Sequence, residues 1–235
     1  MWKRNLKSSI KSITVAIAFF SAFMVMEIMT DILLENYSYP NTNFVYFIIK
    51  MSFNLMLIYF SYRFYRKNRV KSIKRKINLY DILLIFFTYI FLLVIGYYFH
   101  IVWSSAIYGT VSVPFKKFIF STPGPFFTDK WLNMEKYFEL VVFAPIFEEI
   151  LFRGILNNAF EGRIKSVIRV LIVSIIFTIM HIYNIRNVIQ FLGYLSLAIG
   201  LQLIFERRYS LFDSILLHSL SNGLLIIGIM TIQNI

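Results

Sequence analysis

Residues 143–156 read FAPIFEEILFRGIL, an apolar run that contains two adjacent glutamates and one arginine. The run lies inside the longer apolar segment 132–157, and about 20 apolar residues can cross a hydrocarbon core of roughly 30 Å as a helix. An ionised side chain at mid-bilayer costs several kcal/mol, so such residues usually face a bundle interior or a water-filled cavity. The stretch therefore indicates a membrane helix with a buried polar face.

The rest of the chain repeats this apolar pattern. Of the 235 residues, 58% are hydrophobic and 15% are charged, a composition far from that of soluble domains. The pattern predicts an all-α fold, a polytopic membrane helix bundle with about seven transmembrane helices. We place these helices at residues 12–34, 43–62, 79–102, 132–157, 166–184, 187–205 and 211–232.

The basic residues predict the orientation, because cytoplasmic loops collect Lys and Arg. Segments 1–11, 63–76, 161–169 and 206–210 together hold 17 of them, whereas the alternate connections hold four. We therefore expect a cytoplasmic N-terminus and an extracytoplasmic C-terminus. The apolar run that follows the basic start lacks a small-x-small cleavage site, so we expect an uncleaved first helix. The net charge of +12 lies in short loops, and we expect no nucleic-acid partner.

The longest connection, residues 104–130, holds three of the five prolines and a T-P-G-P turn signal. It divides the chain into an N-terminal three-helix membrane portion, residues 1–103, and a C-terminal membrane core, residues 131–235. We expect the connection to be extracytoplasmic, with parts at the membrane interface, where Phe and Trp are enriched. The chain has no cysteine, which excludes disulfides, thiolate metal ligands and cysteine nucleophiles.

The charged residues of segment 132–157 have a spacing that indicates two roles. Glu149 and Arg153 are four residues apart, which places them on one helical face as an ion pair. Glu148 points about 100° away, so it is left to face a cavity as a general base. Pro145 removes a backbone donor and can kink the helix, which makes room for water. A salt bridge that only fixes helix packing is the alternative.

Two later segments contain histidines with a partner at helical spacing. Phe177 and His181 share one face of their helix, and His218 and Asn222 share one face of theirs. Imidazoles can relay protons near neutral pH, and an Asn amide donates hydrogen bonds without being consumed. These groups could handle water and stabilise an oxyanion, with a packing role as the alternative for each.

Other charges within the apolar segments receive a structural interpretation. We interpret Glu27, Asp31 and Lys50 as members of a salt bridge or as snorkelling side chains. The basic run 63–76 is interpreted as a topology anchor beside anionic lipid, with a specific partner site as the alternative.

Taken together, E-E-I-L-F-R (148–153), F-T-I-M-H (177–181) and H-S-L-S-N (218–222) resemble the EExxxR, FxxxH and HxxxN motifs of the CPBP (Abi) family. This family comprises type II CAAX prenyl proteases and bacteriocin-processing or bacteriocin-immunity intramembrane proteases. The resemblance covers about residues 131–230. It implies that a peptide bond is cleaved within the membrane by an activated water.

The resemblance also implies a set of catalytic residues: Glu148, Glu149, Arg153, His181, His218 and Asn222. In this assignment Glu148 and His181 hold and deprotonate the water, and His218 and Asn222 stabilise the tetrahedral oxyanion. The remaining ion pair supports the site. We expect no obligate metal or other cofactor, because an H-E-x-x-H helix is absent and the donors come from separate helices. Glu and His are plausible zinc donors, so a divalent metal such as zinc stays an alternative.

The expected partners are a peptide or lipidated-protein substrate and the lipid bilayer. Scarce Gly with many Phe, Tyr, Ile, Lys and Asn indicates an AT-rich bacterial genome. That setting favours bacteriocin or signalling-peptide processing, or self-immunity, over processing of prenylated proteins. One alternative is a non-catalytic membrane immunity or scaffold protein that binds a bacteriocin or an envelope partner. A proton-coupled transporter is another, although the usual inverted repeat is absent.

Overall fold

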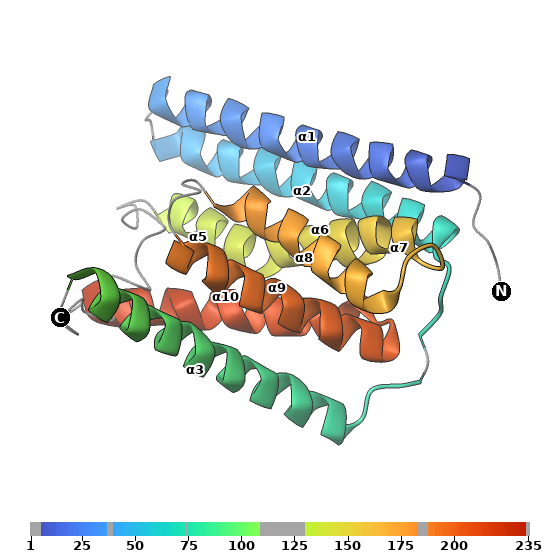
Figure 1. Ribbon diagram of the computed structural model, residues 1–235. Coiled ribbons are helices and arrows are strands. Elements are labelled where there is room, and N and C mark those ends of the chain that lie inside the picture. The colour runs from blue at the N-terminus through green and yellow to red at the C-terminus, as the bar shows by residue number, and fades with distance from the viewer. Residues whose placement is uncertain (1–5, 37–39, 74, 109–129, 183–187, 234–235) are drawn as a thin grey trace. The chain divides into compact units, whose positions relative to one another are not determined.

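The computed structural model describes residues 6–36, 40–73, 75–108, 130–182 and 188–233 (Figure 1). The described residues form helices and no strand, and each of the seven predicted apolar segments contains helix. The predicted all-α helix bundle is therefore confirmed. Most of the predicted connection 104–130 lies outside the described residues, and the helix before it continues to Tyr108.

The helices occur in the following order along the chain: α1 (Leu6–Asn36), α2 (Pro40–Asn68), α3 (Leu79–Tyr108), α5 (Lys130–Phe138), η1 (Glu139–Phe143), α6 (Ala144–Glu149), η2 (Ile150–Leu156), α7 (Asn157–Phe160), α8 (Ser166–His181), α9 (Val188–Arg208) and α10 (Leu211–Gln233). The elements η1 and η2 are π-helices. The predicted helix 132–157 is therefore a continuous helical rod in which two π-helical stretches interrupt the α-helical geometry.

Three of the described helices are long and apolar enough to cross a membrane, over Leu6–Thr30, Asn43–Asn68 and Leu79–Gly96. In α3, large apolar side chains are exposed. Phe87, Phe91 and Val94 are 60%, 61% and 60% exposed, although large apolar side chains exposed together are unusual on soluble proteins. Such a face is suited to contact with lipid.

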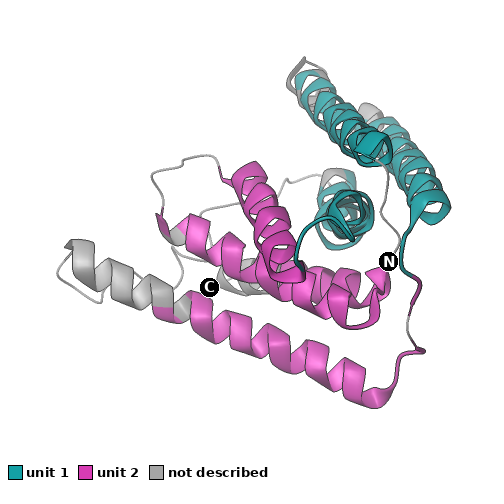
Figure 2. Ribbon diagram, turned by 45° about the vertical axis from the view of Figure 1, so that its right-hand side comes forward, with its two compact units in different colours: residues 1–71, 125–165 teal, residues 72–124, 166–235 magenta. Residues whose placement is uncertain are grey.

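The helices gather into two compact units, each described here by itself (Figure 2). Unit 1 covers residues 1–71 and 125–165 and contains α1, α2 and the pieces from α5 to α7. Unit 2 covers residues 72–124 and 166–235 and contains α3, α8, α9 and α10. The contacts thus group α3 with the last three helices. The predicted division of the chain into residues 1–103, 104–130 and 131–235 stays a prediction.

In unit 1 a close approach of two helices fixes the position of η2. A Cβ atom added at Gly154 would lie 3.1 Å from Cδ2 and 3.2 Å from Cγ of the Tyr65 ring, which belongs to α2. Small residues allow membrane helices to approach in this way. On the side of α1, the rings of Phe23 and Phe147 stack with their centroids 5.2 Å apart. The glutamate-bearing segment is therefore held between α1 and α2.

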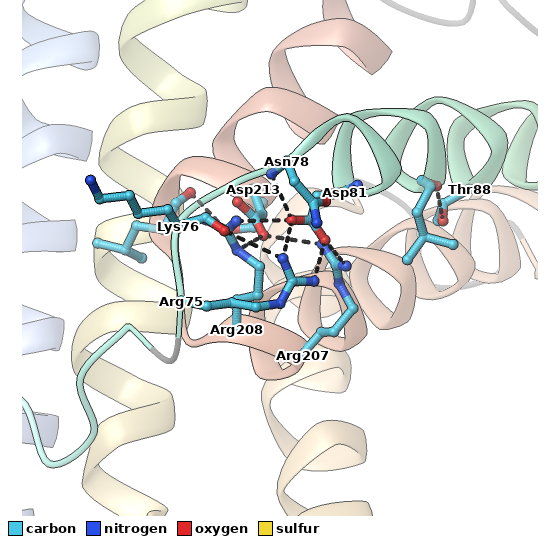
Figure 3. A network of polar contacts seen from close by, with 11 residues as sticks. Arg75, Lys76, Asn78, Asp81, Thr88, Arg207, Arg208 and Asp213 are labelled. Carbon is cyan, nitrogen blue, oxygen red and sulfur yellow. Dashed lines mark hydrogen bonds and ion pairs between the residues drawn. The ribbon is translucent and has the colours of Figure 1, made fainter.

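In unit 2 a cluster of charged side chains joins the start of α3 to the corner between α9 and α10 (Figure 3). Asp81, which is 0% exposed, accepts hydrogen bonds of 2.6 Å from both Nη1 and Nη2 of Arg75. Arg207 and Arg208 also donate to Asp81, and Nε of Arg208 lies 2.9 Å from Oδ2 of Asp213. The hydrogen bond to Asp81 raises the pKa of the Arg75 guanidinium.

This cluster bears on the predicted topology of unit 2. Arg75 comes from the basic segment 63–76, and Arg207 and Arg208 come from the basic segment 206–210. Both segments were assigned to the same side of the membrane, and their arginines meet at one aspartate. Two of the segments that predict the cytoplasmic side therefore lie at the same end of unit 2.

Candidate functional site

In unit 1 the two adjacent glutamates end α6 directly before η2, which carries Arg153. Nη1 of Arg153 donates a hydrogen bond to Oε1 of Glu149 at 3.0 Å, and both side chains are 0% exposed. The predicted i,i+4 ion pair is therefore present. A buried charge is costly unless it is paired, so each of these two side chains depends on the other.

Glu148 differs from its neighbour in exposure. It is partly exposed, whereas Glu149 is fully buried. Glu148 also interacts electrostatically with Arg153, which is closely paired with Glu149. One carboxylate thus belongs to a buried ion pair, and the adjacent carboxylate is accessible. This arrangement agrees with the predicted division of roles, while the catalytic role of Glu148 stays a prediction.

The helix that carries these glutamates is irregular on both sides of them. The π-helix η1 ends at Phe143, and Pro145 occupies the first turn of α6. Proline lacks a backbone N–H and is expected to disturb the hydrogen-bond ladder. The predicted disturbance at Pro145 thus accompanies a π-helix, whereas η2 was not predicted. Such π-helical turns are rare and frequently occur at functional sites.

Unit 1 also contains the predicted salt bridge of the first two helices. Nζ of Lys50 lies 3.0 Å from Oε2 of Glu27, so the structural interpretation of this pair is confirmed. The side chain of Asp31 lies outside the described residues. These charges are on α1 and α2 and involve none of the six predicted site residues.

The same lysine has a second partner that the sequence did not reveal. Nζ of Lys50 lies 2.6 Å from Oε1 of Glu135 on α5. One turn further along the chain, Oε2 of Glu139 accepts a hydrogen bond of 2.6 Å from Nδ2 of Asn54. Glu135 and Glu139 are 5% and 8% exposed. Polar contacts therefore tie the first part of the glutamate-bearing segment to α2.

In unit 2 the ring of His181 is fixed by Phe177, its partner on α8. The two rings stack with centroids 4.1 Å apart and an interplanar angle of 19°. Nδ1 of His181 lies 2.7 Å from the backbone carbonyl oxygen of Phe177. Because a carbonyl oxygen only accepts, Nδ1 carries the proton in this hydrogen bond. In the neutral imidazole Nε2 is then left as the acceptor, as removal of a proton from water requires.

His218 on α10 contacts the same phenylalanine. Its ring meets Phe177 edge-on, with centroids 5.8 Å apart and an interplanar angle of 65°. His218 is 4% exposed, and Asn222, one turn further along α10, is partly exposed. Phe177 itself is 0% exposed. A single buried ring therefore brings the histidines of α8 and α10 together within unit 2.

The sequence motifs did not reveal one residue of this arrangement. The ring of Tyr194 on α9 lies 5.3 Å from the imidazole of His181, between ring centroids, at an interplanar angle of 36°. Tyr194 does not belong to any of the three motifs. The signal that could have found it is the four-residue spacing of Tyr194, Ala198, Gln202 and Glu206, which places polar groups on one face of an apolar helix.

The six predicted site residues therefore form two sets. Unit 1 contains Glu148, Glu149 and Arg153, and unit 2 contains His181, His218 and Asn222. In unit 1 the buried pair of Glu149 and Arg153 lies beside Glu148, and in unit 2 the buried ring of Phe177 contacts both histidines. That the two sets meet in one cavity stays a prediction.

Among the described residues, no group of three or more His, Cys, Asp or Glu side chains could hold a metal ion. The donor set of a zinc hydrolase usually has three protein ligands around the metal. The expectation of a mechanism without an obligate metal is not tested by this observation and stays a prediction.

Comparison with known proteins supports the resemblance that the motifs indicated. A family model described as type II CAAX prenyl endopeptidase Rce1-like matches residues 131–224. The matched range contains the EEILFR, FTIMH and HSLSN motifs and both sets of candidate residues. The chain has no match among curated proteins and none among solved structures.

Proposed function

We propose that this chain, whose residues 131–224 belong to the Rce1-like type II CAAX prenyl endopeptidase family within CPBP, is an intramembrane endopeptidase. It hydrolyses a peptide bond of a membrane-associated or hydrophobic peptide. The observation that carries the proposal is the same in both units. A partly exposed reactive group, Glu148 or His181, stands beside a buried partner that fixes it.

In the proposed reaction Glu148 and His181 hold one water molecule. The hydrogen bond from Nδ1 to Phe177 leaves Nε2 of His181 as an acceptor. Either Nε2 or the Glu148 carboxylate takes one proton from this water, and the water oxygen attacks the scissile carbonyl carbon. The carbonyl oxygen becomes an oxyanion, which accepts hydrogen bonds from His218 and Asn222. The proton taken from water then passes to the leaving amine as the tetrahedral intermediate collapses.

Glu149 and Arg153 have a supporting role in this proposal. Their ion pair is fully buried. The guanidinium therefore keeps the Glu149 carboxylate out of the reaction, in which the Glu148 carboxylate takes part. Since Glu148 is the next residue in the chain, the position of the ion pair also limits where its carboxylate can lie. Precise placement of this kind is a large part of enzymatic rate enhancement.

We further propose that the chain is a bacterial cell-membrane protein with a cytoplasmic N-terminus and an extracytoplasmic C-terminus. The excess of Lys and Arg in alternate connections supports this orientation. The meeting of Arg75, Arg207 and Arg208 at Asp81 in unit 2 supports the placement of their two basic segments on one side of the membrane. Substrates of the proposed class include a bacteriocin, a signalling-peptide precursor or a peptide involved in self-immunity.

The experiment is a peptidomic comparison of two bacterial hosts, one with the native chain and one with Glu148→Gln, matched for the amount of protein in the membrane. We expect a peptide that is trimmed in the first host and untrimmed in the second. A Ser52→Ala host is the control, because Ser52 is exposed and donates a hydrogen bond to the carbonyl oxygen of Ile48 on its own helix. Retained trimming in the Glu148→Gln host contradicts the proposal.

A second comparison separates chemistry from binding. A variant in which Glu148, His181 and His218 are all replaced is expected to lose every function of the native chain. If immunity to a bacteriocin survives these three changes, the chain acts as a non-catalytic immunity or scaffold protein.

A further inference from the structure

The packing seam between α8 and α9 has a polar end. Nη2 and Nε of Arg169 donate to Oε1 of Glu206 at 2.7 and 3.0 Å. Ser166 donates to Oε2 of the same carboxylate at 2.5 Å, and Nε2 of Gln202 donates to Oε1 at 3.2 Å. The side chains of Arg169 and Glu206 are 3% and 12% exposed. Four side chains from two helices are therefore tied together at a largely buried carboxylate.

The other end of the seam is aromatic and belongs to the candidate site. His181 is the last residue of α8, and its ring contacts the ring of Tyr194 on α9. Because α8 ends at His181 and α9 begins at Val188, only a few residues later in the chain, the two helices run in opposite directions along the seam. The spacing between the two contacts can therefore be compared on the two helices by counting residues.

The polar contact and the aromatic contact are separated by the same number of residues on both helices. His181 follows Arg169 by 12 residues on α8, and Glu206 follows Tyr194 by 12 residues on α9. Twelve residues of α-helix span about 18 Å. A contact between Arg169 and Glu206 therefore implies a contact between His181 and Tyr194 at the far end, and both contacts are observed.

Apolar packing alone would not select this register. Val173 and Phe177 lie at four-residue spacing between Arg169 and His181 on α8. Ala198 lies between Tyr194 and Glu206 on α9, and all three side chains are fully buried. In lipid there is little hydrophobic drive between helices, and their association depends on packing and on interhelical hydrogen bonds. A shift of α9 by one turn, about 5.4 Å, would retain apolar contacts but separate Tyr194 from His181. The same shift would leave Arg169 and Glu206 unpaired and buried, which is strongly unfavourable.

We propose that Arg169 and Glu206 are positioning residues: their ion pair sets the register of α9 on α8 and so holds Tyr194 against the imidazole of His181. This inference rests on the proposed function, in which His181 takes part in proton removal from water. It assigns to Tyr194 the task of keeping the imidazole in the orientation in which Nδ1 donates to the carbonyl oxygen of Phe177. Neither arginine nor glutamate touches the substrate in this proposal.

The test is nitrogen NMR of the full chain in lipid nanodiscs, with ¹⁵N-labelled histidine. The chain has three histidines, so His→Gln variants assign each signal. We expect the native His181 to show one tautomer, with the proton on Nδ1. Arg169→Met and Tyr194→Leu should each give a mixture of tautomers at His181, and the combination of both changes should add little to either one.

Two further variants keep the test decisive. The exchange Arg169→Glu with Glu206→Arg restores an ion pair of opposite sense and should restore the single tautomer. Arg75→Met is the matched control, because it removes an arginine–carboxylate contact of unit 2 outside this seam and should leave His181 unchanged. If Arg169→Met fails to fold, Glu206→Gln and the exchanged pair provide the same comparison.

An unchanged His181 signal in folded Arg169→Met or Glu206→Gln protein overturns the proposal. For these two variants we also expect kcat to fall roughly 100-fold with KM unchanged. The substrate is a fluorogenic prenylated CAAX peptide or the peptide found by the host comparison. The two hypotheses fail differently. A native chain that cleaves no peptide contradicts the proposed function, whereas the NMR result decides the positioning role without any activity.

Discussion

Arg153 and Glu149 form an ion pair of 3.0 Å in which neither side chain has any exposed surface. The arginine lies in a π-helix and the glutamate ends the α-helix before it. Removal of one member of such a pair leaves a buried, uncompensated charge, whereas replacement of both members by apolar groups can be neutral. The stability of the chain should therefore respond differently to the single and to the double replacement.

Arg153→Met should lower the free energy of unfolding by about 3–5 kcal/mol, and the double variant Arg153→Met with Glu149→Leu should recover most of that loss. Reversible unfolding in mixed micelles, followed by circular dichroism, measures both values. The double variant should still be inactive, because the ion pair no longer restricts the position of Glu148. A single variant as stable as the native chain would contradict the structural role of the pair.

The two close-packed glycines of the helix seams should respond differently to alanine. At Gly154 the added Cβ meets the ring of Tyr65 at 3.1 Å, and at Gly200 it meets a terminal methyl group of Leu92 at 2.8 Å. A buried ring has little freedom to move, whereas a leucine can change rotamer. We expect Gly154→Ala to cost about 1–3 kcal/mol and Gly200→Ala to cost less, because alanine also favours the helix by about 1 kcal/mol.

Thermal unfolding of the two variants in detergent measures this difference. Gly154→Ala combined with Tyr65→Leu should be more stable than Gly154→Ala alone, because the smaller side chain removes the overlap. The assignment of the strain to the Tyr65 ring is wrong if the second change brings no recovery.

The two carboxylates that share Lys50 should contribute unequally to stability. The side chain of Glu27 is 26% exposed and that of Glu135 is 7% exposed. Partial exposure weakens an ion pair because water screens it. Glu27→Gln should therefore change the unfolding free energy by at most about 1 kcal/mol, and Glu135→Gln should change it more. Equal effects in chemical unfolding would show that exposure does not govern this site.

The two sets of site residues should be close enough to be joined. Since the native chain has no cysteine, a disulfide formed between Glu148→Cys and His181→Cys would be unambiguous. A protease site inserted at residues 161–164, which lie between the two positions, releases two fragments unless the disulfide holds them together. We expect joined fragments for this pair and separate fragments for the control pair Ser52→Cys with His181→Cys. Separate fragments in both cases would contradict a shared catalytic cavity.

Peptide cleavage should survive removal of metal ions. The proposed reaction uses a carboxylate and an imidazole to activate water, so we expect full activity after exhaustive chelation and dialysis. Loss of activity that zinc restores would instead indicate a metal-dependent mechanism. Elemental analysis of the active protein in detergent provides the independent check.

Much of the helical framework could be predicted because it depends on local chemistry. Hydropathy along the chain located all seven helical segments, since each membrane helix satisfies its own backbone hydrogen bonds within the segment. The i,i+4 spacing of Glu149 and Arg153 predicted their ion pair, and the same spacing predicted that Phe177 and His181 share a face. These contacts lie within one helix, so sequence distance determines them.

Contacts between helices required the tertiary structure. The sequence indicated a salt bridge or snorkelling for Glu27, Asp31 and Lys50. It did not reveal Glu135, which lies 85 positions after Lys50 in the chain and reaches it from another helix. It also gave no reason to connect Tyr194 with His181. Such contacts depend on the register and rotation of one helix against another, and an apolar helix surface offers several registers of similar energy.

The sequence by itself therefore determined that the chain is a bundle of membrane helices and that acidic, imidazole and amide groups recur on three of them at helical spacing. Only the tertiary structure decided that Glu149 is fully buried while Glu148 is partly exposed, and that Arg169 on α8 pairs with Glu206 on α9. The physical reason is range. Helix formation depends on neighbours within one turn, whereas burial and contacts between helices depend on side chains that only folding brings together.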